Sequence, residues 1–377
     1  MSKVFDVLIV GAGIVGTACA RELTAAGLSV CVLERDTVGS GATAAGMGHI
    51  VVMDDNLAQL TLTRFSQMLW NTLVQETPGE HEYTRCGTIW IASDAEEMQA
   101  VRAKHTLFAA HAVPGEILDA GQLYEFEPHL RPGLAGGLLV PDDGVVYPPR
   151  SAATFMRQAA LQGATLHSGT ATRLLSSEVG VQLADGQEIK AGAIVLANGA
   201  LAPELLPDLP IRPKKGHMAI TDRYPGFVRH QLVELGYLKS AHASDGDSVA
   251  FNAQPRATGQ ILIGSSRQLD ITSSEIERTI LARMLNTALA YLPELGQLNC
   301  IRCWTGFRAA TPDGLPLIGP YGGRPGVWLA TGHEGLGITT ALATAHLLAA
   351  QMLERAPAIS YDPYLPARTF QKEGNHA

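Results

Sequence analysis

The chain has 377 residues, of which 46% are hydrophobic and 17% charged, so it can build a large buried core and is long enough for two domains. Its formal net charge is −8 and it has no long run of Lys or Arg, which argues against nucleic acid as a partner and leaves at most a peripheral contact with a membrane. Its five cysteines lack a disulfide spacing and no apolar stretch is long enough to span a bilayer, so we expect a cytoplasmic protein.

The first elements of the chain predict a nucleotide-binding unit. Residues 4–10 are predicted to form a short buried strand, which leads into the glycine motif of residues 11–16 and then a helix that ends near residue 26. A second strand, 28–33, ends at Glu34. Strand, glycine turn, helix, strand and acid in this order form the dinucleotide-binding fingerprint, whereas a glycine-rich turn of another α/β protein is the alternative.

Each residue of this fingerprint has a physical role. Gly11 permits the tight turn, Gly13 lets the backbone approach a pyrophosphate, and Gly16 lets the helix pack on the strand. The first turn of the helix presents N–H groups to the anion. We expect Glu34 to accept hydrogen bonds from the hydroxyls of the adenosine ribose.

Two further segments favour FAD over NAD as the dinucleotide. Residues 39–48 are a long run of small residues after the second strand, where main chain could lie along an extended cofactor. Near the other end, a strand at 327–330 is followed by the glycine-rich residues 331–337 and a helix over 338–353. The start of that helix would face a negative group such as the pyrimidine edge of a reduced flavin.

The middle of the chain interleaves helices and strands without a repeat. Helices are predicted near 57–77, 94–111, 120–127, 150–162 and 273–292. Strands are predicted near 87–91, 136–140, 164–168, 170–173 and 193–197, and a further pair of strands turns at Asp185-Gly186. Strands are also predicted through most of 217–263, with turns at Asp245-Gly246 and Thr258-Gly259.

This order predicts a mixed α/β fold in which a Rossmann-like FAD-binding domain is interleaved with a substrate-binding domain rich in β-sheet. The FAD-binding domain would use residues 1–50, 140–205 and 310–377, and the substrate-binding domain 51–139 and 206–309. The reactive ring of the cofactor should lie where the two domains meet.

Five ordered motifs together resemble a known family. They are VLIVGAGIVG with Glu34-Arg35, GATAAGMG, ANGA at 197–200, GFRAATPDGLPLIG at 306–319 and TGHEGLGIT at 331–339. With them the chain resembles the FAD-dependent D-amino acid, glycine and sarcosine oxidases. It is most similar to subunits of the hydrogen cyanide synthase and D-hydroxyproline dehydrogenase type, with which it shares GMGHIVVMDD at 46–55 and GHEGLG at 332–337.

The resemblance implies that FAD is held by residues spread over both ends of the chain. The matching positions are Gly11, Gly13, Ile14, Val15, Gly16, Glu34, Arg35, Ala42, Thr43, Ala45, Gly46, Met47, Gly48, Thr172, Ala197, Asn198, Gly199, Gly306, Gly332, His333, Gly335, Leu336, Gly337, Ile338 and Thr339.

The resemblance also assigns the substrate carboxylate to Arg308. A planar, permanently charged guanidinium can give a carboxylate two parallel hydrogen bonds. The alternative is that Arg308 pairs with Asp313 to hold the turn at 312–314. His49, Asn252, His333 and Glu334 are further candidates for substrate contact, although a buried histidine is as readily structural and an acid at a helix start is a good cap.

Several positions depart from the family pattern. Asn252 stands where glycine oxidases carry an aromatic hydroxyl, and Gly335 where they carry a second arginine, so a roomier substrate cavity is expected. Gly306 stands where sarcosine oxidases carry the cysteine that tethers the flavin, and Leu262 where they carry a lysine facing it. FAD should therefore be noncovalent and its reaction with oxygen slower.

The expected reaction is hydride transfer from the α carbon of a small amino acid or cyclic imino acid to flavin N5, with D-hydroxyproline as the leading substrate. No dedicated catalytic base is obligatory, because the cofactor supplies the difficult chemistry. An oxygen-using glycine or sarcosine oxidase and a flavin-bearing electron-relay subunit of a heteromeric complex remain alternatives, so accessory subunits or a homo-oligomer are possible partners. We expect no metal, since the Cys300-x-x-Cys303 pair lacks a second ligand pair.

Overall fold

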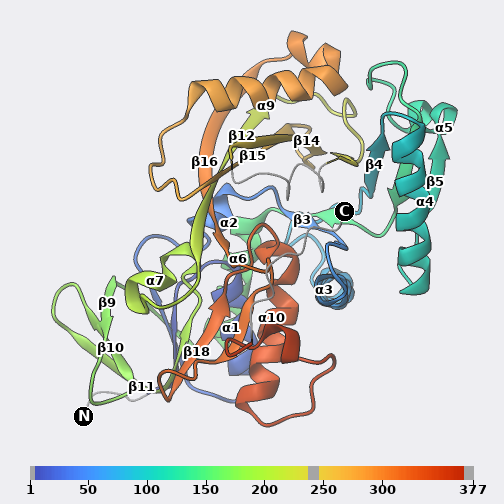
Figure 1. Ribbon diagram of the computed structural model, residues 1–377. Helices are drawn as coiled ribbons and strands as arrows, with labels where there is room; N and C mark the ends of the chain where they lie inside the picture. The colour runs from blue at the N-terminus through green and yellow to red at the C-terminus, as the bar shows by residue number, and fades with distance from the viewer. Residues whose placement is uncertain (1–4, 237–245, 369–377) are drawn as a thin grey trace.

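The computed structural model describes residues 5–236 and 246–368, which build two large sheets with helices around and between them (Figure 1). The first sheet has eight strands: β17-β18-β11-β1-β2-β8 in spatial order, with β10 and β9 continuing from β11 as a hairpin. Their bounds are β1 Phe5–Val10, β2 Val30–Glu34, β8 Thr165–Ser168, β9 Ala171–Leu174, β10 Gly180–Leu183, β11 Glu188–Leu196, β17 Leu317–Pro320 and β18 Val327–Thr331.

The parallel part of this sheet brings the carboxyl ends of five strands to one edge. Strands β18, β11, β1, β2 and β8 pair in parallel, so their carboxyl ends lie at the same edge. Strand β1 has β2 on one side and β11, from much later in the chain, on the other. In open α/β sheets such a switch in connection direction opens a crevice outside the carboxyl ends of the strands.

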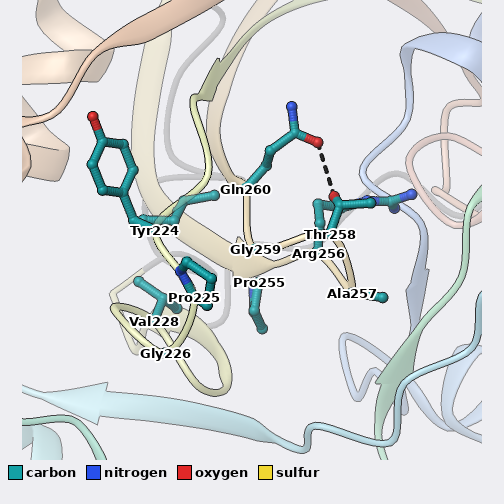
Figure 2. A pocket seen from close by; sticks show the side chains of 11 residues that line it. Tyr224, Pro225, Gly226, Val228, Pro255, Arg256, Ala257, Thr258, Gly259 and Gln260 are labelled. Atoms are coloured by element: carbon teal, nitrogen blue, oxygen red, sulfur yellow. Dashed lines mark hydrogen bonds between the residues drawn. The ribbon is translucent and has the colours of Figure 1, made fainter.

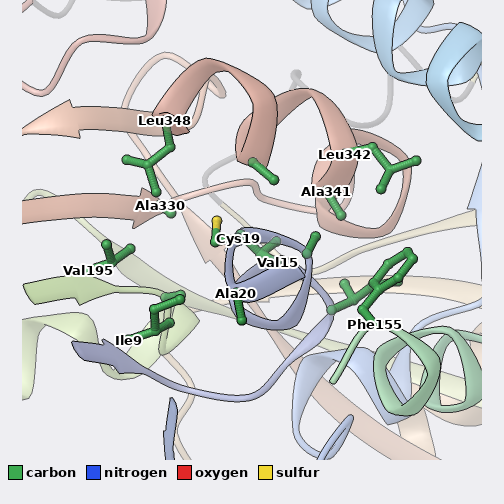
Figure 3. Packing of buried hydrophobic residues seen from close by; sticks show 14 of the residues in the cluster. Ile9, Val15, Cys19, Ala20, Phe155, Val195, Ala330, Ala341, Leu342 and Leu348 are labelled. Carbon is green, nitrogen blue, oxygen red and sulfur yellow. The ribbon is translucent and has the colours of Figure 1, made fainter. Parts of the chain in front are cut away.

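Helix α1 (Ile14–Ala25) forms the centre of the core beneath this sheet. Nine of its twelve residues are buried, and it packs between α6 (Pro148–Leu161) and α10 (Gly337–Met352). Figure 3 shows Val15, Cys19 and Ala20 of α1 among apolar side chains of the sheet and of α10. A helix that is apolar on nearly all faces can lie only in such a buried position. The chain leaves it through Gly27, whose φ of 91° suits a helix C-terminus.

The second sheet has eight strands in the order β16-β12-β15-β14-β13-β4-β6-β5. Helix α9 (Arg278–Tyr291) covers β14 and β15, while α4 (Ala95–Ala110) and α5 (Ala120–Phe126) pack at the end that holds β4, β5 and β6. The strand bounds are β4 Thr88–Ala92, β5 Glu116–Asp119, β6 Gly136–Val140, β12 Arg212–Thr221, β13 Gln231–Glu234, β14 Ser248–Pro255, β15 Ile261–Leu269 and β16 Cys300–Ala310.

Further elements complete the fold. Helix α2 (Ala42–Ala45) packs against β16, and the chain continues into β3 (His49–Ile50), which pairs with β7 (Gly144–Val145) (Figure 1). Helix α3 (Leu57–Glu76) packs against α10. The remaining elements are α7 (Ala202–Leu205) and the 3-10 turns η1 (Gly199–Leu201), η2 (Pro293–Gln297) and η3 (Asp362–Tyr364).

The mixed α/β fold expected from the sequence is confirmed, and most predicted elements occur within a few residues of their predicted bounds. The turn at Thr258-Gly259 is present, since the N–H of Arg256 donates to the carbonyl of Gln260 across it. The predicted turn at Asp245-Gly246 lies partly outside the described residues. We propose that the two sheets mark the two domains, with the boundaries given above.

Three differences from the expected elements have physical reasons. The strand after the turn at 185–186 and the buried strand near 193–197 are one strand, β11, because its first half pairs with β10 and its second half with β1. Helix α9 begins at Arg278 instead of residue 273, because its extended N-cap residue Glu277 is bound by the side chains of Lys215 and His217. Strands β16 and β17 were not predicted, because glycine and proline interrupt their apolar pattern.

No helix within the described part of the chain combines the length and the apolar character needed to cross a membrane.

Candidate active site

The glycine turn after β1 has the close contacts that a nucleotide-binding turn requires. Gly11 has a φ of 105°, and a Cβ on it would lie 2.8 Å from the carbonyl oxygen of Ala197 at the end of β11. A Cβ on Gly16 would lie 2.0 Å from the carbonyl oxygen of Gly11. Neither position has room for a side chain, so both glycines are fixed by the packing of α1 on the sheet.

Gly13, at the start of α1, is less crowded than Gly11 and Gly16. It is the N-cap residue with a φ of −65° and no side-chain cap, and its added Cβ would meet only the Thr43 hydroxyl at 3.2 Å. That hydroxyl accepts a hydrogen bond from the N–H of Ile14 at 3.0 Å. The remaining N–H groups of the first turn, with the positive end of the helix dipole, suit a pyrophosphate.

Glu34 lies at the carboxyl end of β2, beside this turn. One carboxylate oxygen accepts from the N–H of Ala12 at 2.7 Å and the other from the N–H of Asp36 at 2.8 Å. A carboxylate has about four acceptor sites, so these bonds fix its orientation and leave capacity for ribose hydroxyls. Arg35 instead turns toward solvent and pairs with Asp36 at 3.2 Å.

The small residues after β2 lie directly against the second sheet. A Cβ on Gly306 of β16 would lie 2.4 Å from the Cβ of Ala45, and the indole N–H of Trp304 donates to the carbonyl of Ala45 at 3.2 Å. A Cβ on Gly46 would lie 2.6 Å from the side chain of Ile338 in α10. The segment that contains Ala42, Thr43 and α2 is therefore held between β16 and the start of α10.

The segment between β18 and α10 reaches the same region from the other end of the chain. A Cβ on Gly337 would lie 3.9 Å from the side chain of Val15, so the starts of α1 and α10 are neighbours. The hydroxyl of Thr339 donates to the carbonyl of His49 at 2.8 Å. Gly332 has a φ of 78°, and Leu336 is the N-cap residue of α10.

The remaining predicted cofactor positions divide into two groups. Ala197, Asn198 and Gly199 follow β11 at the carboxyl edge, and Asn198 Oδ1 is buried without a hydrogen-bond partner among the described residues. Gly48, whose φ is 97°, packs on the carbonyl of Val146. Thr172 is exposed on β9, where its hydroxyl donates to the carbonyl of Gln182 at 3.1 Å.

These residues fit FAD. The crowded glycines at the turn, the uncapped start of α1, the carboxylate of Glu34 and the adjacent start of α10 lie along one edge of the first sheet. The small residues of α2 continue this edge toward the second sheet. A dinucleotide consists of an adenosine, a pyrophosphate and a second nucleoside with its ring. Along this edge, Glu34 suits the adenosine ribose, the start of α1 suits the pyrophosphate, and the small residues of α2 suit the second ring.

Arg308 lies on β16, opposite Lys214 of β12, and faces the inner side of the second sheet. Its guanidinium fills the space above Gly216, where a Cβ would lie 2.6 Å from Nη1, and Nη1 donates to the carbonyl of Ser266 at 3.0 Å. The alternative pairing with Asp313 is wrong, because both carboxylate oxygens of Asp313 accept from Arg368 at 2.7 and 2.9 Å.

Glu334 forms an ion pair with Lys214 at 3.0 Å, beside Arg308. Its N–H donates to the carbonyl of Ala309 at 2.9 Å, which fixes the acid next to the arginine, and its φ of 49° lies in the left-handed region. Burial opposes ionisation of Glu334, but the positive charges of Lys214, Arg308 and Arg267 outweigh it and lower the pKa to about 2. The carboxyl group is therefore charged at neutral pH.

A cluster of buried polar groups lies farther along the second sheet. Gln254 donates to the carbonyl of Met47 at 2.5 Å, while the Oδ1 of the buried Asn252 has no hydrogen-bond partner among the described residues. Burial lowers the pKa of His49 to about 4, although the neighbouring amide of Gln254 acts in the opposite sense. Because the His49 Nε2 forms no hydrogen bond to that amide within the geometric limits, burial dominates the pKa. His49 is therefore neutral at physiological pH.

Apolar side chains complete this region. Met47, Met218 and Leu262 form a small buried cluster, with Trp304 packed against it. A Cβ on Gly264 would lie 3.1 Å from the sulfur of Met218 and 3.2 Å from that of Met47. The surface thus changes from charged at Arg308 to apolar at Leu262.

His333 has a different position from the other candidates. Its Nε2 is hydrogen-bonded to the hydroxyl of Thr344 in α10 at 2.9 Å, and burial lowers its pKa to about 3. The imidazole thus joins the loop after β18 to the helix that follows.

Lys214, Gly216 and Gln254 were not singled out from the sequence. Lys214, Gly216 and Met218 alternate along β12 and so share a face, but a period of two is visible only once the strand bounds are known. The pairing of β12 with β16, which brings Lys214 beside Arg308, has no local signal in the sequence.

A hollow lies beside the turn between β14 and β15 (Figure 2). Its volume is about 250 Å³, and it is lined by the turn between β14 and β15 and by the segment from Tyr224 to Val228. None of the residues discussed as cofactor or substrate positions lines it.

Comparison with known proteins agrees with the geometry. Residues 6–351 match the family described as DAO, FAD dependent oxidoreductase. A glycine oxidase of Pseudomonas aeruginosa is 32% identical over 385 residues, which cover 96% of this chain and 98% of that protein. The hydrogen cyanide synthase subunit HcnC of the same species is 26% identical, over 99% of this chain and 98% of its own.

Among solved structures, glycine oxidase from Geobacillus kaustophilus superposes with a TM-score of 0.87 at 26% sequence identity. The superposition covers 97% of this chain and 99% of that protein. The family match spans nearly all of the described residues, and the resemblance inferred from the sequence motifs is confirmed. The chain belongs to the family of FAD-dependent oxidoreductases, and FAD is its cofactor.

Proposed function

We propose that this enzyme oxidises the CH–NH bond of a small amino acid or cyclic imino acid, with D-hydroxyproline as the leading substrate, and that it acts as a dehydrogenase. The observation that carries this proposal is the state of Arg308. It faces the space between the sheets, its nearest acid in the sequence is engaged by Arg368, and its guanidinium retains donors for a substrate carboxylate.

Each neighbouring side chain has a proposed task. Glu334 is charged and adjacent to Arg308, so it can receive the substrate ammonium or a ring hydroxyl. Asn252 offers a buried oxygen that lacks a partner among the described residues, which suits a polar substituent. A zwitterion or hydroxylated ring would thus meet one cation, one anion and one neutral acceptor.

The other residues control protons and water. The neutral His49 cannot donate a proton to the substrate amine, which must lose its proton before a hydride leaves the adjacent carbon. Met47, Met218 and Leu262 exclude water from the part of the cavity that faces α2. When bound, FAD supplies the acceptor for the hydride, which carries both electrons of the oxidation.

We propose that FAD is noncovalent and that oxygen is a poor acceptor. Gly306 contacts Ala45 so closely that a cysteine side chain would not fit there, and Leu262 provides no positive charge at the flavin. The name of the relative HcnC describes a subunit, which supports accessory electron-transfer subunits or a homo-oligomer as partners. A cytoplasmic location is part of the proposal, since none of the five cysteines, all of which lie among the described residues, forms a disulfide.

A second candidate is an oxygen-using glycine oxidase, because the 32% identical relative has that name. The test is anaerobic bleaching of the bound flavin by glycine, sarcosine, proline and both enantiomers of hydroxyproline. Peroxide formation is then compared with reduction of a dye. Rapid bleaching by D-hydroxyproline with dye reduction would support the proposal, and peroxide from glycine would support the second candidate. A flavin that stays oxidised with every amino acid would instead favour an electron-relay subunit.

A further inference from the structure

We propose that Cys300 and Cys303 form a redox-active dithiol site on the edge of the second sheet, which exchanges with low-molecular-weight disulfides such as oxidised glutathione. The site lies outside the residues proposed for cofactor and substrate, and it does not depend on the proposed function. The two Sγ atoms are 3.6 Å apart.

The irregular start of β16 explains why these two sulfurs meet. Residues three apart in a regular strand point to opposite faces of a sheet. Here Ile220 pairs with Arg302 and Thr221 with Cys300, so Ile301 is an extra residue in β16. This bulge turns Cys300 to the side of the sheet on which Cys303 lies.

The surroundings give the two thiols different access. Cys300 is exposed, on an edge strand with no neighbour on its outer side among the described residues. Cys303 is partly buried and packs against the apolar cluster under α9. Burial, with the neighbouring Cys300, raises the pKa of Cys303 to about 11. Cys300 is therefore the thiol that a disulfide can reach first, and Cys303 the one that completes the reaction.

The other three cysteines lie elsewhere in the fold and are less accessible than Cys300. Cys19 and Cys31 are buried in the first sheet and α1, and burial raises the pKa of the Cys86 thiol to about 12. The site also faces away from the cofactor segment, because Trp304, the residue after Cys303, points to Ala45 on the other face. Oxidation of the pair should therefore leave the candidate active site unchanged.

The exchange takes place in two steps. The Cys300 thiolate attacks one sulfur of the glutathione disulfide, that S–S bond breaks, and one glutathione leaves and takes up a proton. The Cys303 thiolate then attacks Cys300 Sγ in the mixed disulfide and releases the second glutathione. The protein pair loses two electrons and two protons, which the small disulfide gains as two thiols. Closing the bond from 3.6 Å to about 2 Å requires side-chain rotation.

The test treats the FAD-bound enzyme with mixtures of reduced and oxidised glutathione, quenches with acid, alkylates the free thiols and maps them by mass spectrometry. The wild type should contain an internal Cys300–Cys303 disulfide. Cys303→Ser should stop at glutathione on Cys300, and Cys300→Ser should react at least about tenfold more slowly, since its remaining thiol is shielded. Cys86→Ser is the matched control and should behave as the wild type.

The rate of ring closure should rise with pH, because the Cys303 thiol must first lose its proton. Phenylarsine oxide, which needs two adjacent thiols, provides a readout in the unmodified chain and should protect both cysteines from alkylation. Three results would each overturn the proposal: glutathione that stays on Cys300 of the wild type, a Cys300→Ser variant that reacts as fast as the wild type, or no reaction at either position.

Discussion

The carboxyl edge of the first sheet and the inner face of the second sheet offer different kinds of contact to the ligands proposed for them. At the edge, main-chain N–H groups and crowded glycines such as Gly11 and Gly16 form the proposed cofactor site, together with the carboxylate of Glu34. On the inner face, Arg308 and Glu334 define the proposed substrate site by charge. A site built from backbone is specified by the fold, whereas a site built from side chains can change its ligand without changing the fold. Mutations should therefore separate cofactor binding from substrate choice.

The largest effect is expected at the edge of the first sheet. Gly13→Val should abolish FAD incorporation, because the side chain would occupy the space at the start of α1 while the backbone, with φ of −65°, tolerates it. The measurement is the flavin-to-protein absorbance ratio after purification. Gly322→Val is the control, since nothing lies within 4 Å of an added Cβ there. A fully flavinated Gly13→Val enzyme would contradict the assignment of this turn.

The next effect concerns the second sheet alone. Arg308→Ala should leave the FAD content unchanged and raise KM for the substrate by roughly a hundredfold, or about 3 kcal/mol, because a carboxylate would lose a charged partner in a half-buried site. Steady-state kinetics with a dye acceptor measure it. Arg308→Lys should recover part of the loss, since lysine keeps the charge without the two parallel donors. An unchanged KM would remove Arg308 from the substrate site.

A smaller effect should reveal how Glu334 selects the charge of the substrate. Glu334→Gln leaves the ammonium of Lys214, now 3.0 Å from a neutral amide, next to Arg308. The ratio of kcat/KM for iminodiacetate to that for glycine should rise by about tenfold, because two adjacent cations favour a second carboxylate. The double variant with Lys214→Met should reverse the change. A ratio that stays constant in both variants would show that Glu334 does not face the substrate.

A different kind of effect, on stability instead of catalysis, is expected at His333, which joins the loop after β18 to α10. Burial lowers the pKa of His333 from 6.5 to about 3, so between these values the unfolded chain binds a proton that the folded protein does not. The free energy of unfolding should fall as the pH is lowered through this window, by about 1.4 kcal/mol per pH unit from this group. His333→Gln should reduce the slope seen in urea unfolding at pH 7, 6 and 5.

Asp143 provides a comparison of opposite sign. Burial raises its pKa from 3.8 to about 7, so the folded protein binds the extra proton and gains stability as the pH falls between these values. Asp143→Asn should therefore steepen the loss of stability on acidification. Equal slopes for both variants and the wild type would mean that these side chains are hydrated in the folded state.

The two regions also differ in how far the sequence predicts them. The glycine turn and Glu34 lie within 30 residues of one another, and their spacing alone identifies a dinucleotide site. The residues of the proposed substrate site on the inner face of the second sheet have no such local pattern. Lys214, Arg308 and Glu334 come from β12, β16 and the loop after β18, and only the pairing of the strands brings them together.

Asp313 illustrates the same limit. It is close to Arg308 in the sequence, and that closeness suggested a pair, yet its partner is Arg368, 55 residues away. Sequence distance determines contacts in a turn or a helix, but an extended strand such as β16 carries its side chains away from the turn that follows it. The resemblance to a family, and not the local pattern, is what assigns the substrate carboxylate to Arg308, and that assignment stays a prediction.

The link between Asp313 and Arg368 has a practical consequence for anyone who shortens or fuses this protein. Arg368 also donates to the carbonyls of Leu315 and Pro316, so one side chain fastens the whole turn that leads from β16 into β17. A truncation that removes Arg368 would release that turn. It would thereby loosen β16, the strand that carries Arg308, although Arg368 itself is 60 residues away from Arg308 in the sequence. Affinity tags and fusion partners are better attached beyond this arginine.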